Sequence, residues 1–134
     1  MENKIKISEM LTPYKKHLIK FYLKFARELI DDKDSWTQSG GAFDGYGNSC
    51  HPSSDVARCW GSLDAVRAGM GKDSLPHCGM DTYILAAAIL NRHSPDISFL
   101  EYNDRPDTKH SDIIAVFDNA IESLDVSEGE WNNG

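Results

Sequence analysis

The feature that most constrains the fold is an apolar run in the second half of the chain, Thr82-Tyr83-Ile84-Leu85-Ala86-Ala87-Ala88-Ile89-Leu90. Wound into a helix, this run is apolar on nearly every side, and a helix of that kind needs other elements packed around it. Asp81 stands where it can cap the helix, and Ser94-Pro95 ends it. The run therefore predicts a central, buried helix.

A helix is also predicted near the start of the chain, after Thr12-Pro13. The threonine oxygen can accept a hydrogen bond from a free amide, and proline suits the first helical position. Apolar residues then recur at helical spacing up to residues 31–34, with basic residues on the opposite face. The predicted core stripe is Leu11, Tyr14, Leu18, Tyr22, Phe25 and Leu29, broadened by Ile19, Ala26 and Ile30.

The middle of the chain predicts a third helix, which opens at Pro52-Ser53-Ser54-Asp55 and stops at Gly69-Met70-Gly71. Small residues recur every four positions along it, so a neighbouring element is expected to approach closely. These small residues are Ala57, Gly61 and Ala65, and the apolar face holds Val56, Cys59, Trp60, Leu63 and Val66.

Shorter elements are predicted around these helices. Residues 35–53 favour an irregular hairpin with Asp44-Gly45 as a type I′ turn pair, and residues 97–102 favour a short strand. The last helix is expected to begin at Asp107 or Thr108. Its core stripe is Ile113, Phe117, Ala120, Ile121 and Leu124.

Together these elements predict one mainly α (α+β) domain over residues 1–134, a compact bundle of about four helices with a short irregular β-hairpin and one short strand. The ordered core is expected at about residues 10–125, with a frayed tail at 126–134. No window approaches the roughly 18 apolar residues of a membrane span, and the first residues lack the apolar region of a secretory signal. We therefore expect a cytoplasmic protein with no membrane partner.

The net charge of −7 is divided unevenly: residues 1–30 carry seven Lys/Arg against three Asp/Glu, and the remainder carries seven against eighteen. The basic residues of the first helix are Lys15, Lys16, Lys20, Lys24 and Arg27. We expect that face to be solvated or to dock on the acidic C-terminal segment, which holds Asp118, Glu122, Asp125, Glu128 and Glu130. Nucleic acid, which needs a concentrated basic surface, is not an expected partner.

The soft metal ligands of the chain are Cys50, His51, Cys59, His77 and Cys78. Their spacing lacks any Cys-x-x-Cys or His-x-x-x-His pair, and adjacent residues such as Cys50 and His51 rarely both reach one ion. The odd number of cysteines, without an export signal, favours reduced thiols over disulfides. We therefore expect no metal and no cofactor.

The most suggestive region chemically is the glycine- and aromatic-rich loop from Trp36 to Cys50, together with the polar turn from Asn103 to Asp107. Aromatic rings could stack on a planar group, amides could read polar edges, and Arg105 could face an anion. The equally weighted alternative is that Trp36 is a core anchor that closes the loop. The predicted ligand-binding residues are Trp36, Gln38, Tyr46, Asn103, Asp104 and Arg105, with Phe43 and Asn48 beside them.

A catalytic alternative uses Asp104 or Asp107 with His110, as in a small hydrolase or transferase. A thiol nucleophile at Cys50 with a histidine is a further variant. Turn and capping roles account for Asp104 and Asp107 equally well. The catalytic residues, and whether the protein is an enzyme, stay open at this point.

Several motifs together resemble an uncharacterised family of small bacterial and phage proteins, a domain of unknown function. The motifs are Trp36-Thr37-Gln38 with Ala42-Phe43, then Ala57-Arg58-Cys59-Trp60-Gly61-Ser62-Leu63, Tyr102-Asn103-Asp104-Arg105-Pro106 and Phe117-Asp118-Asn119-Ala120-Ile121. The resemblance spans about residues 20–124 and departs from the family pattern after Cys59, where one residue fewer precedes the glycine. It implies a compact helical domain in which Trp36, Gln38, Asn103 and Asp104 lie together.

These observations lead us to expect a non-catalytic binding protein, a phage accessory or counter-defence factor that binds a host protein or a small nucleotide-like ligand. The grounds are small size, acidity, the polar and aromatic loop, and the lack of a strong catalytic signature. The sequence leaves open whether the chain forms a homo-oligomer.

Overall fold

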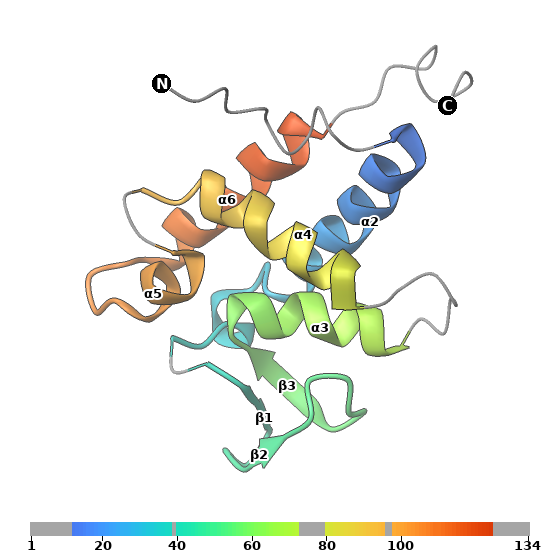
Figure 1. The fold of residues 1–134 in the computed structure, drawn as a ribbon. Helices are drawn as coiled ribbons and strands as arrows, with labels where there is room; N and C mark the ends of the chain where they lie inside the picture. The colour runs from blue at the N-terminus through green and yellow to red at the C-terminus, as the bar shows by residue number, and fades with distance from the viewer. Residues whose placement is uncertain (1–11, 39, 73–79, 96–97, 125–134) are drawn as a thin grey trace.

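The computed structural model of the protein describes residues 12–38, 40–72, 80–95 and 98–124. In chain order the elements are α2 (Pro13–Leu29), η1 (Lys33–Ser35), β1 (Ala42–Asp44), β2 (Ser49–Cys50), β3 (Ala57–Trp60), α3 (Ser62–Lys72), α4 (Met80–Arg92), α5 (Phe99–Asp104) and α6 (His110–Ser123). Figure 1 shows the small sheet at one end of the molecule, with α3 between it and the helices α2, α4 and α6. The predicted mainly α domain with a small β part is confirmed.

Helix α2 begins where its sequence predicts, but its buried face differs in part from the predicted core stripe: Tyr14 is 46% exposed, and Leu23, which was not in the stripe, is buried. Thr12 is the N-cap, and its Oγ1 accepts a hydrogen bond from the amide of Lys15 at 3.1 Å. The helix packs against α3, α4 and α6, so it touches every other long helix described. Its buried side chains are Leu18, Ile19, Tyr22, Leu23 and Ala26.

One residue of the basic face of α2, Arg27, contacts the acidic helix α6, whereas Lys24 on the same helix is exposed. Arg27 Nε lies 2.6 Å from Asp118 Oδ1 in α6, and Arg27 Nη1 lies 2.8 Å from Asp31 Oδ1. The hydrogen bond to Asp118 is the main reason that the pKa of Arg27 is raised above its usual value. This ion pair connects α2 and α6 at the molecular surface.

The largest correction concerns the third predicted helix, whose first half is a strand. Strand β3 pairs antiparallel with β1, and Ala42 lies opposite Trp60. The strand order is β2-β1-β3, with a register shift beside Asp44. The helical spacing of apolar residues was misleading here because pairing with β1, a contact distant in sequence, decides the backbone conformation.

The β1–β2 hairpin is present, but its turn differs from the predicted type I′ turn. The glycine with positive φ is Gly47, at 84°, rather than Gly45. Its amide donates to the Asp44 carbonyl at 3.1 Å, and the Asp44 amide donates to the Asn48 carbonyl at 2.9 Å. This pattern is a three-residue loop that ends in a left-handed glycine.

Helix α3 begins at Ser62, so Ala57, Gly61 and Ala65 do not share one helix face as predicted. Gly61 is the junction between β3 and α3, where the chain passes very close to Gly40. A Cβ on Gly61 would lie 3.1 Å from the Gly40 Cα. The space at this junction therefore requires glycine.

The predicted stop at Gly69-Met70-Gly71 is also wrong, because α3 continues to Lys72. Gly69 is instead a packing position. A Cβ there would lie 2.7 Å from Cδ1 of Phe25 in α2. The glycine allows α2 and α3 to approach each other closely.

The strand predicted at residues 97–102 is wrong over its described part, because α5 begins at Phe99. Ser98 is the N-cap, and its Oγ accepts from the amide of Glu101 at 3.2 Å. The turn after α5 leads into α6, which begins at His110 rather than at Asp107 or Thr108.

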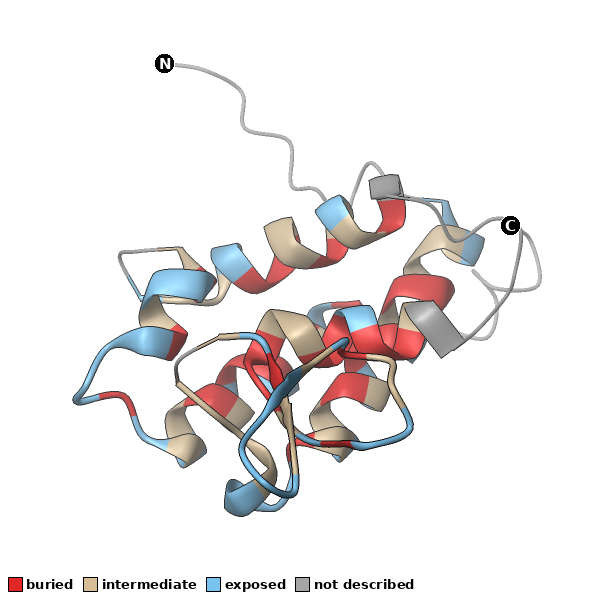
Figure 2. Cartoon of the chain, turned by 90° about the horizontal axis from the view of Figure 1, so that it is seen from below, coloured by how far each residue is buried: buried red, intermediate tan, exposed pale blue. Residues whose placement is uncertain are grey.

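The core lies between the helices, and Figure 2 shows the buried faces of the helices turned toward the interior. Phe99 of α5 meets Phe117 of α6 edge to face, with ring centroids 5.5 Å apart. Helix α4 is present as predicted, but it is not enclosed on every side. Ile84 is 57% exposed, whereas Ala86, Ile89 and Leu90 are buried.

None of the helices described is long and apolar enough to cross a membrane. Several predictions lie outside the described part of the chain: the frayed tail at 126–134, the residues His77 and Cys78, and the capping side chain of Asp81.

Candidate functional site

The structure brings together two of the sequence motifs through one buried amide, that of Asn103. This residue lies in the last turn of α5 and is 2% exposed. Its Oδ1 accepts hydrogen bonds from Trp36 Nε1, at 2.7 Å, and from the Ser62 hydroxyl. Its Nδ2 donates to the Thr37 carbonyl at 3.1 Å and to Asp104 Oδ1 at 3.0 Å. We call these five residues the Asn103 network.

Gln38 makes a second connection between the same two segments. Its Nε2 donates to the main-chain carbonyls of Arg105 and of Thr108, the latter at 3.2 Å. The amide of Thr37 meanwhile donates to the Trp60 carbonyl at 3.0 Å, beside the bridge between Trp36 and Trp60. The connection after η1 is thus attached on one side to β3 and on the other to the α5–α6 turn.

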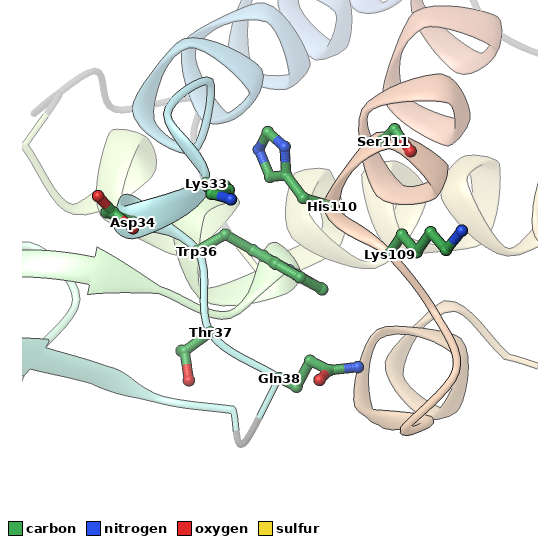
Figure 3. A pocket seen from close by; sticks show the side chains of 8 residues that line it. All are labelled: Lys33, Asp34, Trp36, Thr37, Gln38, Lys109, His110 and Ser111. Carbon is green, nitrogen blue, oxygen red and sulfur yellow. The ribbon is translucent and has the colours of Figure 1, made fainter.

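A hollow of about 670 Å³ opens beside Trp36, and we call it the Trp36 hollow. Its volume falls within the usual range for small-molecule sites, about 300–1,000 Å³. Figure 3 shows the indole edge-on in this hollow, between His110 on one side and Thr37 and Gln38 on the other. The lining residues are Lys33, Asp34, Trp36, Thr37, Gln38, Lys109, His110 and Ser111.

The charge of the Trp36 hollow favours an anion. Lys33 and Lys109 form no ion pair with any residue that the structure describes, and Asp34 is the only carboxylate among the lining residues. His110 and Ser111 are the first residues of α6, and the start of a helix carries partial positive charge. A flat aromatic surface thus lies beside two lysines and a helix N-terminus.

His110 is fixed by contacts on both sides of its ring. Its Nε2 lies 2.6 Å from the Ile30 carbonyl, an acceptor, so this nitrogen carries the proton. The ring centroid lies 5.8 Å from that of Trp36, with the planes inclined by 54°. His110 therefore forms part of the wall beside the indole.

Of the predicted ligand-binding residues, Trp36 and Gln38 line the Trp36 hollow, whereas Asp104 and Arg105 line other hollows. Tyr46 lies apart from all of these. It is 93% exposed at the tip of the β1–β2 hairpin, and it does not line the Trp36 hollow. Asp44 Oδ1 accepts from the amides of Tyr46 and Asn48, each at 2.9 Å, and these bonds lower the pKa of Asp44. The tip is thus an ordered turn that presents one aromatic ring to solvent.

The residues of the catalytic alternative line three different hollows. Asp104 lies beside Leu100 and Pro106, whereas Asp107 faces Tyr102 in a second hollow and lies 3.5 Å from the guanidinium of Arg105. His110 lines the Trp36 hollow. None of these three hollows is lined both by His110 and by Asp104 or Asp107, the pairing that the catalytic alternative uses.

The cysteine alternatives also lack a base in reach among the residues described. His51 Nδ1 bonds to Ser53, and Cys50 packs against the core. Burial raises the pKa of the Cys59 thiol, which disfavours the thiolate that a nucleophile needs. In the described part of the chain, no three His, Cys, Asp or Glu side chains are grouped to hold a metal ion.

The predicted site residues did not include the lysines of the hollow or two members of the Asn103 network, Thr37 and Ser62. Lys33 and Lys109 come from segments far apart in the chain, and isolated lysines carry no periodic signal. The apolar pattern predicts that Ser62 lies inside a helix, whereas α3 begins at this residue. Its position directly after Gly61, a junction residue, is the signal that could have marked it as a helix start.

Comparison with known proteins gives one match. The model of a family described as a family of unknown function, DUF6197, matches residues 17–123. No curated protein and no solved structure matches the chain significantly.

Proposed function

Because the chain belongs to the DUF6197 family of unknown function, its activity has to be inferred from its geometry, and we propose that it is a non-catalytic binding protein for a small, nucleotide-like anion. The observation that carries the proposal is the Trp36 hollow, in which a hydrogen-bonded indole lies beside Lys33 and Lys109. A planar group would stack on the indole, and its phosphate would lie near the two lysines and the start of α6.

In this proposal the protein acts in the cytoplasm as a phage accessory or counter-defence factor. That role is suggested by the resemblance to small bacterial and phage proteins. The hollow supports the small-ligand form of the proposal, because its volume suits a nucleotide and its lysines complement a phosphate.

Isothermal titration at low salt with adenosine 5′-monophosphate tests the proposal directly. Adenosine and ribose 5-phosphate serve as separate arms, because each keeps only one of the two recognised groups. We expect both fragments to bind more weakly than the complete nucleotide. The proposal fails if the nucleotide shows no binding at millimolar concentration, or binds no better than ribose 5-phosphate.

Matched variants locate the binding. Trp36→Ala is expected to weaken binding by about tenfold or more, since base–aromatic stacking contributes about 1–3 kcal/mol. Lys33→Gln with Lys109→Gln should weaken it further as the phosphate contact is lost. Lys24→Gln, an exposed lysine on α2, is the control for charge and should leave the affinity unchanged. Equal effects of the paired lysine change and the control would place the ligand elsewhere.

A second candidate function, binding of a host protein, is favoured by the 93% exposure of Tyr46 on an ordered turn. Tyrosine is enriched at the centres of protein interfaces. A pull-down from host lysate should recover a partner with wild type and with Tyr14→Ala, a control on α2, but not with Tyr46→Ala. Recovery that is independent of Tyr46 would contradict this candidate. Light scattering on the same samples measures self-association.

A further inference from the structure

We propose that Asn103, which does not line the Trp36 hollow, is the positioning residue that sets the Trp36 indole for the ligand. The inference rests on the proposed function of the hollow and names the residue on which its affinity depends. A ring that is already in place when the ligand arrives costs less ordering on binding.

The amide of Asn103 has only one orientation that satisfies its partners. The indole Nε1–H can only donate, so it must face Oδ1, and the Thr37 carbonyl can only accept, so it must face Nδ2. With Ser62 and Asp104 as the remaining partners, both acceptor positions and both donor positions of the amide are occupied. No bonding capacity is left for direct contact with a ligand, so Asn103 acts through Trp36.

Two of these bonds reach consecutive residues of the segment that forms the wall of the hollow. One fixes the side chain of Trp36, and the other fixes the main chain of Thr37. Both torsions of the indole side chain are therefore restrained at once, since the ring and the adjacent backbone bind the same rigid amide. The ring is half-buried: it packs against the hydrophobic core and also lines the hollow.

A variant at Ser62 can distinguish this positioning role from a general contribution of the network to stability. Its hydroxyl donates to the same Asn103 oxygen, but Ser62 is 1% exposed at the start of α3 and does not line the hollow. Removing the Ser62 hydroxyl deletes one bond of the network and leaves the bond to Trp36 in place.

The experiment compares adenosine 5′-monophosphate binding by full-length wild type, Asn103→Ala and Ser62→Ala. We expect the Kd to rise about tenfold for Asn103→Ala, the equivalent of about one lost hydrogen bond to the positioned ring, and less than about threefold for Ser62→Ala. Equal Kd values for the two variants would overturn the positioning role while leaving the proposed function standing. Absence of binding by wild type would overturn the proposed function and this inference with it.

A second measurement applies even where Asn103→Ala does not fold. In ¹⁵N-labelled wild type, with Trp36→Phe to assign the resonance, the Trp36 indole N–H should exchange slowly with solvent both without ligand and with it. Rapid exchange in the free protein that becomes slow only when the nucleotide binds would show that the ligand, rather than Asn103, orders the ring.

Discussion

Trp36 and Tyr46 lie in the same glycine-rich segment, but Trp36 is held by a contact distant in sequence, whereas the turn that carries Tyr46 is held by contacts between near neighbours. Trp36 is half-buried, and its indole binds Asn103, which is 67 positions away in the chain. Tyr46 is 93% exposed, and its turn is closed by bonds from Asp44 to residues two and four positions away. One aromatic belongs to the tertiary structure, and the other belongs to a local turn.

The difference shows that composition alone does not identify a binding site. A stretch rich in glycine and aromatic residues predicted one candidate surface, whereas the structure divides it between a hollow and a projecting hairpin. The two parts should respond differently to substitution and to pH. The Asn103 network should dominate stability, and the hairpin tip should contribute only locally.

The largest effect of a change in the Asn103 network is expected from Asn103→Ala, which removes the hydrogen bonds that Asn103 makes with the Trp36 indole N–H, the Thr37 carbonyl and the Ser62 hydroxyl. A buried polar group left unsatisfied costs about 1–3 kcal/mol, so the free energy of unfolding should fall by about 3 kcal/mol or more. Urea denaturation measures the change. Ser62→Ala is the matched control, with an expected loss of about 1 kcal/mol. Similar losses for the two variants would argue against a four-bond network.

A smaller effect is expected from Gly61→Ala, which tests the close approach between the start of α3 and Gly40. The added Cβ would lie 2.8 Å from Asp64 Oδ2 and 3.1 Å from the Gly40 Cα, so backbone must move. Overpacking of this kind costs about 1–3 kcal/mol. Gly45→Ala at the hairpin tip is the control, since its Cβ would lie 4.0 Å from Arg58 Cγ. Thermal denaturation that ranks Gly45→Ala as the more harmful change would contradict this packing.

Acid should loosen the hairpin tip before it affects the Trp36 region. Hydrogen bonds from Asn48 and Tyr46 lower the pKa of Asp44 in the folded state. The resulting stabilisation is complete above the unfolded value of about 3.9 and is lost as the pH falls through the lower folded pKa. The NMR amide signals of Tyr46 and Asn48 should therefore move below about pH 4, while the Trp36 indole signal stays. Asp44→Asn should abolish this pH dependence.

The smallest effect on stability is expected from Tyr46→Ala. Because the ring is 93% exposed, its removal should change the free energy of unfolding by no more than about 0.5 kcal/mol. Tyr22→Ala is the contrasting variant: this ring is 1% exposed in the core, and its loss should cost about 3–5 kcal/mol. Guanidinium denaturation of both variants measures the contrast. A large loss for Tyr46→Ala would show that the hairpin tip has a tertiary role.

The sequence predicted those elements whose signals are local. Thr12-Pro13 marked the start of α2, and the apolar stripe along that helix is largely its buried face. The apolar patterns of α4 and α6 also predicted these helices, apart from the exposure of Ile84 and the start of α6 at His110. A cap and a helical period lie within a few residues of each other, so they can be read without the rest of the fold.

The errors in secondary structure occur where a contact distant in sequence determines the backbone conformation, or where the element is short. Strand β3 exists because β1 pairs with it, and no local pattern at Ala57–Trp60 reports that partner. Helix α5 is only six residues long, and a short apolar run does not distinguish helix from strand. A local signal was nevertheless present, because Ser98 and Glu101 have the spacing of a capping box.

The candidate site was predictable in part. The resemblance placed Trp36, Gln38 and Asn103 together, and the hydrogen bonds of Asn103 and Gln38 agree with that placement. Tertiary structure, by contrast, separates Tyr46 from these residues. It also brings Lys33 and Lys109, from two distant segments, to the same hollow. Whether these residues bind a ligand stays a prediction.

The Asn103 network also has a consequence for the order of assembly. Its members come from three segments, residues 36–37, Ser62 and residues 103–104. Each long-range bond needs two of these segments to meet, and the complete network needs all three. Closing loops of this length costs conformational entropy before the bonds reward it, so we expect the complete network to form after the folding transition state. Bonds absent from that state slow unfolding without speeding folding. The network would then set how long each native molecule survives once it has folded.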